Sequence, residues 1–161
     1  MKPRILGILL ILPLILTSCF GAISFFRWDA NCGEWLQNAA NANTIEIAKN
    51  RLDKAIDYLE SNKITSGSSN ILWETPNTNI KIWYENLKAT QKDLASAPAN
   101  ISKLEESNTL MKLRETLIDD SRVVVPENIS LYPHQFLYVI CSVVFGFLMF
   151  FGLILVTLKE D

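Results

Sequence analysis

Two long apolar runs, one at each end of the chain, dominate the pattern of hydrophobic and polar positions. Residues 5–26 and residues 136–158 contain no charged side chain, and the runs are 22 and 23 residues long. A helix needs about 20 apolar residues to cross the roughly 30 Å hydrocarbon core of a bilayer. The pattern therefore predicts one transmembrane helix at each end of the chain.

The polar stretch between these runs carries apolar residues at the three- and four-residue spacing of amphipathic helices. Helices are expected over residues 35–62, over about residues 79–95 and beyond Pro98, because proline fits the first turn of a helix but not its interior. Gly33 is expected to separate the first of them from the membrane segment. The apolar positions of the three helices are, in order, Ile45, Ala48, Leu52, Ala55, Ile56 and Leu59; Ile80, Trp83, Leu87 and Leu94; and Ile101, Leu104 and Met111, widened by Leu110, Leu113 and Leu117.

The economical arrangement is an antiparallel hairpin in which the long first helix packs against the two shorter ones in tandem. The predicted fold class is therefore all-α, with two transmembrane helices flanking an exoplasmic antiparallel helical hairpin or small bundle. Residues 64–79 are rich in turn formers, and their apolar part, residues 71–73, is expected to fold back onto the bundle. Ser102 and Glu105 have the spacing of an N-terminal capping box, and residues 123–126 are expected to form an extended tether.

Basic residues around the first apolar run predict the orientation. Lys2 and Arg4 precede the run, whereas only Arg27 follows it, next to Asp29, so the N-terminus is expected to be cytoplasmic. The second run returns the chain to the same side of the plasma (inner) membrane. The expected organisation is a cytoplasmic segment 1–4, a span 5–26, an exoplasmic (periplasmic or extracellular) domain 27–135, a span 136–158 and a cytoplasmic tail 159–161.

Aromatic residues stand where the chain is expected to leave the bilayer. Trp28 follows the first apolar run, and Tyr132 and Tyr138 lie close to the start of the second. Trp and Tyr are enriched at membrane–water interfaces because each ring combines an apolar body with a polar atom. These three residues are therefore expected to be interfacial anchors.

The end of the first apolar run allows a second interpretation. The segment Leu16-Thr17-Ser18-Cys19, which follows Lys2 and Arg4, resembles the lipobox of a bacterial lipoprotein signal, and Cys19 would then be lipidated. Residues 20–26 continue the apolar run, whereas the start of a released lipoprotein is usually polar, and a cleaved signal has a shorter apolar region. An uncleaved anchor is favoured. Both interpretations leave the middle domain outside and membrane-held.

Charge and composition narrow the range of partners. Residues 27–135 contain 12 of the 15 Lys and Arg residues and 15 of the 17 Asp and Glu residues, with the two signs interspersed. No basic stripe is available to neutralise phosphates, so nucleic acid is not an expected partner. The apolar runs contain no Asp, Glu, Lys, Arg or His, which disfavours an ion or proton pathway. The lipid bilayer is the expected partner of these runs.

Candidate chemistry is sparse. His134 is the only histidine, and the cysteines Cys19, Cys32 and Cys141 do not occur at metal-ligand spacing with it. No phosphate-binding loop, nucleophile elbow or metalloprotease helix is present. We therefore expect no enzymatic activity, no catalytic or metal site and no cofactor.

Two sets of residues are candidates for contacts with other helices or proteins. Ser18 with Ala22, and Ser142 with Gly146, place small residues one turn apart in the apolar runs, which lets helices approach closely. In the domain, Trp73, Tyr84 and Cys32 are the candidates for an exposed interaction surface.

Two stretches carry a resemblance to a group of proteins. They are Asn41-Ala42-Asn43-Thr44-Ile45-Glu46-Ile47-Ala48 and Trp83-Tyr84-Glu85-Asn86-Leu87-Lys88. They resemble uncharacterised bacterial membrane-anchored helical proteins without a known activity, which implies a bacterial setting and no particular site.

Two functions fit these expectations. The first is a non-enzymatic structural or accessory protein that presents its helical domain to another membrane protein or to a second copy of itself. The second is an exoplasmic ligand-sensing module, because two spans around a helical bundle resemble bacterial sensor domains. Since only residues 159–161 follow the second span, sensing would act through a separate output subunit.

Overall fold

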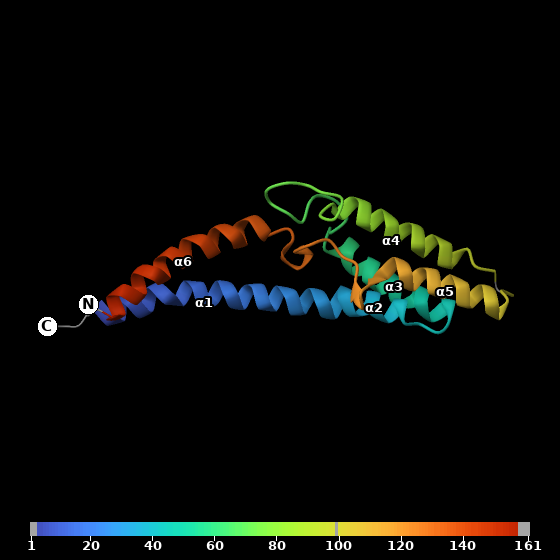
Figure 1. The fold of residues 1–161 in the computed structure, drawn as a ribbon, viewed down its shortest axis with the longest axis horizontal. Coiled ribbons are helices and arrows are strands. Elements are labelled where there is room, and N and C mark those ends of the chain that lie inside the picture. Colours follow the sequence, from blue (N-terminus) through green and yellow to red (C-terminus); the bar gives the residue numbers. More distant parts are fainter. Residues whose placement is uncertain (1–2, 99, 158–161) are drawn as a thin grey trace.

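The computed structural model describes residues 3–98 and 100–157, and this part of the chain is mostly helical (Figure 1). The first apolar helix, α1, spans Pro3–Trp28, and the second, α6, spans Gln135–Thr157. Both are long and apolar enough to cross a membrane, so the two predicted candidate spans are confirmed in length and composition.

The helices α1 and α6 run antiparallel and are closest near the start of α1 and the end of α6 (Figure 1). A Cβ atom on Gly7 would lie 2.6 Å from the carbonyl oxygen of Gly152, so the two backbones touch where neither residue has a side chain. Further along, Gly21 faces the ring of Tyr138, whose hydroxyl oxygen would lie 2.7 Å from an added Cβ. These two contacts connect the two apolar helices, and the helical domain lies at the opposite end of the molecule (Figure 1).

The connection between α1 and the domain is a continuous helix. A π-helical turn, η1 (Asp29–Gly33), joins α1 directly to α2 (Glu34–Ala40). The expectation that Gly33 separates the two is wrong, because Gly33 has helical dihedral angles and is packed tightly by the ring of Trp28 and the carboxylate of Asp29. The domain is therefore joined to α1 by helix that continues through the π-helical turn.

The predicted helix over residues 35–62 is interrupted after Ala40. The side chain of Thr44 accepts a hydrogen bond from the Ile47 amide at 3.3 Å and so caps a new helix, α3 (Ile45–Ser61). Asn and Thr side chains bond to nearby backbone groups and thus compete with a continuous helix. The interruption at residues 41–44 reverses the chain, and α3 runs back along α2 (Figure 1).

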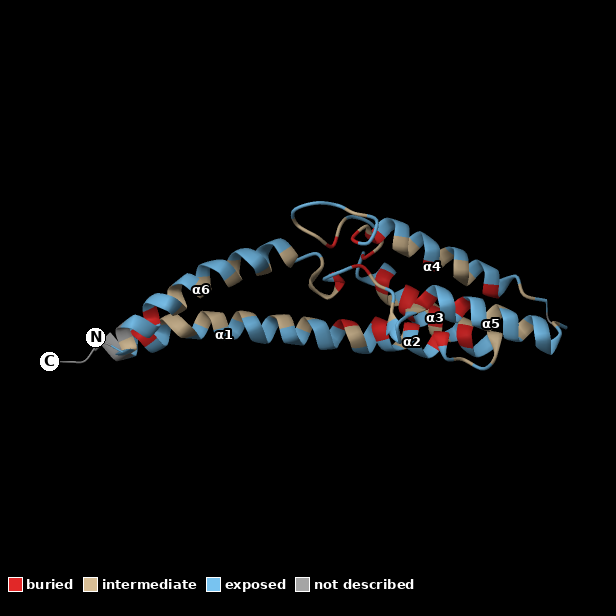
Figure 2. Ribbon diagram, in the orientation of Figure 1, coloured by how far each residue is buried: buried red, intermediate tan, exposed pale blue. Residues whose placement is uncertain are grey.

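Two further helices complete a small up-down-up-down bundle with α2 and α3. They are α4 (Ile80–Ala95) and α5 (Lys103–Leu117), and each runs opposite to the helix before it (Figure 1). The bundle replaces the expected hairpin of one long helix against two in tandem, because the first helix is broken into two. Figure 2 shows the buried residues gathered where these helices face one another, and they include Leu36, Leu52, Ile56, Leu59, Ile80, Leu87, Leu94, Leu113 and Leu117.

After α5 the chain forms a minimal antiparallel hairpin, so the fold is not purely helical. Strand β1 (Ile118–Asp119) pairs with β2 (Arg122–Val123), and both turn residues between them have positive φ angles. The expected tether is attached to the bundle, because the Val124 carbonyl accepts a hydrogen bond from the Trp83 indole nitrogen at 2.9 Å. A short 3₁₀ turn, η2 (Ile129–Leu131), then leads into α6.

The loop between α3 and α4, residues 62–79, is attached at its base to the start of α6. The Tyr132 hydroxyl donates a hydrogen bond to the Ser66 carbonyl at 3.0 Å, and the Gln135 side-chain amide donates to the Ser68 carbonyl at 3.1 Å. Residues 71–73 do not fold back onto the bundle as expected, since Leu72 and Trp73 are both exposed.

Candidate functional site

The residue types that carry chemistry lie apart from one another. Within residues 3–98 and 100–157, no group of three His, Cys, Asp or Glu side chains is placed to hold a metal ion. Cys32 is fully buried in the core of the bundle, whereas His134 is exposed just before α6. All three cysteines are free thiols, with Cys19 exposed on α1 and Cys141 partly buried on α6.

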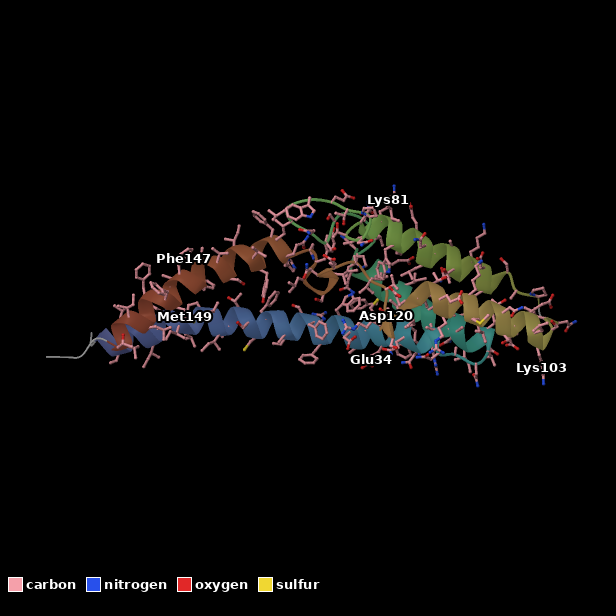
Figure 3. All side chains as sticks on the ribbon, viewed as in Figure 1. Glu34, Lys81, Lys103, Asp120, Phe147 and Met149 are labelled. Atoms are coloured by element: carbon pink, nitrogen blue, oxygen red, sulfur yellow. The ribbon has the colours of Figure 1, made fainter. Side chains whose placement is uncertain are left out.

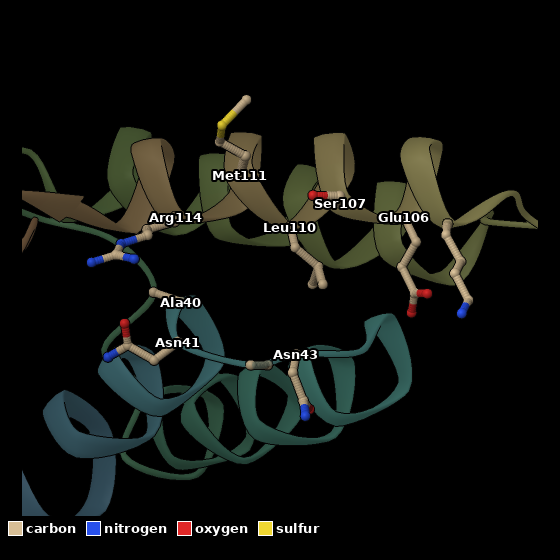
Figure 4. Close-up of a pocket in the computed structure, with 10 residues that line it drawn as sticks. Ala40, Asn41, Asn43, Glu106, Ser107, Leu110, Met111 and Arg114 are labelled. Carbon is tan, nitrogen blue, oxygen red and sulfur yellow. The ribbon is translucent and has the colours of Figure 1, made fainter.

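An open groove of about 600 Å³ lies between α5 and the corner that joins α2 to α3 (Figure 4). Leu110 and Glu106 point from α5 toward this corner in Figure 4. Glu106 accepts a hydrogen bond from the Ile45 amide at 3.3 Å, which gives the start of α3 an acidic partner across the groove. Lys103 and Arg114, at opposite ends of α5, bring two positive charges to the same groove.

Two apolar side chains are exposed on the face of α5 beside this groove, which also carries the exposed polar residues Asn108 and Glu115. Leu104 is 72% exposed and Met111 is 58% exposed, and their spacing of two helical turns places them on one side of α5. Met111 points away from the α2–α3 corner in Figure 4. The apolar positions of α5 were expected to form one wide core face, but the bundle buries Leu113 and Leu117 and leaves Leu104 and Met111 in solvent.

The predicted interaction residues Trp73, Tyr84 and Cys32 do not form one surface. Trp73 is exposed in the loop of residues 62–79, whereas Cys32 lies in the core and has no exposed area. Tyr84 is on α4, and its hydroxyl donates a hydrogen bond to the carboxylate of Glu60 on α3. Of the three, only Trp73 presents most of its side chain to the surroundings.

The predicted small-residue pairs do not form the close contact between the two apolar helices α1 and α6. Ser18 and Ala22 are exposed on α1, and the Ser142 hydroxyl donates to the Tyr138 carbonyl of its own helix at 2.8 Å. A Cβ on Gly146 would meet no atom of the described chain within 4 Å. The close contact uses Gly7 and Gly152 instead, which the small-residue spacing did not identify.

Where α1 and α6 separate, an apolar wedge of about 550 Å³ remains between them. Its lining on α1 includes Leu16 and Phe20, and its lining on α6 includes Leu137 and Phe145, while His134 lies at its rim. Cys141 also faces this wedge.

Sequence reasoning missed the groove beside α5. Two features of the sequence could have indicated this groove. The segment Asn41-Ala42-Asn43-Thr44 interrupts the first helix, and the capping box at Ser102 starts α5, so these two features position the two walls of the groove.

No protein-family model matches the chain, and neither a curated protein nor a solved structure matches it. The resemblance to bacterial membrane-anchored helical proteins therefore stays an expectation.

Proposed function

We propose that this protein is a non-enzymatic, two-pass membrane protein that presents its helical domain to another membrane-held protein. In this proposal α1 and α6 cross the bilayer with both termini cytoplasmic, and the bundle of α2–α5 lies on the exoplasmic side. Support comes from the two apolar helices and from the basic residues that precede the first of them. The continuous helix from α1 into α2 would hold the bundle at a set height above the membrane.

The observation that carries the proposal is the pair of exposed apolar side chains on α5, Leu104 and Met111, next to an open groove. Leu104 and Met111 are exposed on α5, and Met111 lines the groove together with Leu110. Methionine and arginine are enriched at protein interfaces, and an amphipathic helix commonly binds by laying its apolar face into such a groove. The groove carries Lys103 and Arg114 together with Glu106, whose carboxylate already accepts a hydrogen bond from the Ile45 amide, so its net charge is positive and favours a partner helix with acidic side chains.

A photo-crosslinking experiment in native membranes tests this assignment. A photoreactive amino acid is placed at Met111 and, as a matched control, at Asp57, which is exposed on α3. We expect a defined adduct with one partner from position 111 and much less from position 57. The double charge reversal Lys103→Glu, Arg114→Glu should weaken that adduct, because it removes the attraction for acidic side chains.

Four outcomes would contradict the proposal. Equal adducts from both positions, or none from position 111, would show that the face of α5 is not a docking site. An adduct that is insensitive to the charge reversal would contradict an acidic partner. An adduct with twice the mass of the chain would show that the occupant is a second copy of this protein.

A further inference from the structure

The exposed loop of residues 62–79 lies where the proposed membrane span begins. In Figure 1 this loop extends from the bundle toward the membrane helices, and its tip is level with the first turn of α6 along the long axis of the molecule. The hydrogen bonds from Tyr132 to Ser66 and from Gln135 to Ser68 hold its base against the start of α6.

The base of the loop is hydrogen-bonded and partly buried, whereas its tip is apolar and uncovered. Ser69 and Thr78 are buried, and the Ser69 amide donates a hydrogen bond to the Thr78 carbonyl at 2.9 Å. At the tip, Leu72 is 75% exposed and Trp73 is 63% exposed. The hydrogen bonds at the base hold the loop in place while two adjacent apolar side chains at its tip stay exposed. Such exposed apolar side chains indicate a surface that contacts another molecule.

Two of the residues expected to anchor the domain at the membrane–water interface, Trp28 and Tyr138, pack against other parts of the protein instead. Trp28 is only 7% exposed and belongs to the core, and the ring of Tyr138 packs against Gly21. Exposed apolar side chains occur at both helix ends, with Phe26 near the end of α1 and Phe136 at the start of α6. Leu72 and Trp73 add two more exposed apolar side chains, on a loop whose tip reaches the level of the first turn of α6 (Figure 1).

We propose that Leu72 and Trp73 insert into the headgroup–acyl boundary of the exoplasmic leaflet and so give the domain a third attachment to the membrane. Tryptophan favours this depth because its ring is apolar and its N–H group can still reach water. The proposal rests on the membrane crossing of α1 and α6, and it is independent of any protein partner at α5.

The partner is the apolar and interfacial part of the lipid rather than a charged headgroup. The loop of residues 62–79 contains no basic cluster, because Lys63 and Glu74 are its two charged residues and have opposite signs. Basic clusters are what attract anionic lipids, so this loop should bind without them. The contact should therefore persist in zwitterionic phosphatidylcholine and at high salt, because salt screens charge attraction but does not weaken apolar burial.

The test uses the full chain, with Cys19→Ser and Cys141→Ser, reconstituted in phosphatidylcholine vesicles. Cys32 is retained because it is fully buried, and the protein without an added cysteine measures its background labelling. A polarity-sensitive fluorophore is attached at Leu72→Cys, and quenching by spin-labelled lipids is measured. Leu104→Cys is the matched control, since it is a similarly exposed leucine at the far end of the bundle, next to Lys103 in Figure 3.

We expect the fluorophore at position 72 to be quenched by the lipids several-fold more than the one at position 104. A third label at Val144→Cys, on the exposed surface of α6, separates the two proposals. Quenching at 144 without quenching at 72 would overturn the loop insertion alone. Absence of quenching at 144 would overturn the membrane crossing itself. Iodide in the aqueous phase quenches fluorophores that are exposed to water. If the fluorophore at position 72 were quenched neither by iodide nor by the spin-labelled lipids, a protein would cover the loop and the insertion would be contradicted.

A second measurement avoids labels. Brominated lipids quench tryptophan fluorescence by contact, so Trp73→Phe should reduce the quenched part of the signal. Trp83→Phe is the control, because Trp83 donates its indole N–H to the Val124 carbonyl in the bundle. Equal lipid quenching in the Trp73→Phe variant and the unsubstituted protein would contradict the insertion of Trp73.

Discussion

At the scale of single residues, a cluster of Glu60, Tyr84 and Lys88 links α3 to α4. The Tyr84 hydroxyl donates a hydrogen bond to Glu60 Oε1, and Lys88 Nζ lies 3.2 Å from the same oxygen. The hydrogen bonds from Tyr84 and Lys88 lower the pKa of Glu60. Partial burial, together with the hydrogen bond to Glu60, raises the pKa of Tyr84 to about 12. The cluster is therefore most favourable with Glu60 ionised and Tyr84 protonated.

This cluster predicts a pH dependence of the stability of the bundle. A carboxyl whose pKa is lowered by folding stabilises the fold above its ordinary pKa of 4.5, and the effect is lost as the pH falls through the lowered value. The raised pKa of Tyr84 stabilises the fold below 10, and this effect is lost as the pH rises toward about 12. Glu60→Gln should cost about 0.5 kcal/mol near neutral pH, because solvent screens these largely exposed groups, and the cost should shrink in acid.

Thermal unfolding of the detergent-solubilised protein, followed by circular dichroism at several pH values, checks this prediction. Glu115→Gln on the exposed side of α5 is the control and should change the melting temperature little. A loss in Glu60→Gln that is the same in acid and at neutral pH would contradict a role for the ionised carboxylate.

Ser102 supplies a second prediction at this scale, because it starts α5 with a capping box. Its hydroxyl oxygen accepts a hydrogen bond from the Glu105 amide at 3.3 Å, and its own amide donates to the Glu105 carboxylate at 3.1 Å. Ser102→Ala should lower the free energy of unfolding by about 1 kcal/mol. Ser107→Ala, in the middle of the same helix, should cause no loss, since alanine is the better helix former there. Denaturant unfolding of both variants distinguishes the two effects.

At the scale of elements, the crossing of α1 and α6 depends on where side chains are absent. A Cβ on Gly7 would lie only 2.6 Å from the carbonyl oxygen of Gly152, so the two helices can meet there only as backbone against backbone. Association of helices in lipid relies on such close packing, because lipid tails are as apolar as the helix surfaces and supply no hydrophobic driving force. An added Cβ on Gly146 would meet no atom of the described chain within 4 Å, and the Ser142 hydroxyl donates to its own helix, so the spacing of the predicted small-residue pairs did not locate the contact.

A pair of glycine substitutions tests this contact. Gly7→Val should force α1 and α6 apart and cost about 1–3 kcal/mol, the usual range for an overpacked contact. Gly146→Val should be tolerated, because an added Cβ there meets no atom of the described chain within 4 Å. Thermal unfolding in mild detergent measures both. A similar loss in the two variants would contradict the assigned contact and would point to packing at Gly146 between copies of the chain.

At the scale of the whole molecule, the antiparallel pair α1 and α6 places both apolar helices on one side of the bundle. The continuous helix through η1 and the hydrogen bonds from the loop of residues 62–79 to the start of α6 connect the bundle to this pair at two points. Such an arrangement favours a domain that is held at a set position above the bilayer.

Cysteine labelling tests the proposed topology of the whole molecule. Asn43→Cys, in the exposed corner between α2 and α3, should react with a membrane-impermeant maleimide in intact cells if the bundle is exoplasmic. A tag added after Asp161 should become accessible only after the cells are permeabilised. The unsubstituted protein controls for the three native cysteines. The opposite pattern, with an accessible tag and no labelling of the Asn43→Cys variant above that control, would reverse the orientation.

Local features of this protein were predictable from its sequence alone. The two candidate spans, the limits of α4 and the capping box of Ser102 follow from the length of an apolar run, from helical periodicity and from hydrogen bonds between residues three positions apart. Each of these depends on residues that are close together in the chain.

Burial and contacts between distant segments were decided only by the tertiary structure. Trp28 is buried because η1 carries the helix into the bundle, and Leu72 and Trp73 are exposed because the loop is held by its base at α6. Leu104 is exposed because α2 and α3 cover a different face of α5. A helix with apolar residues on more than one side can bury either side, and the sequence does not say which neighbour will cover it.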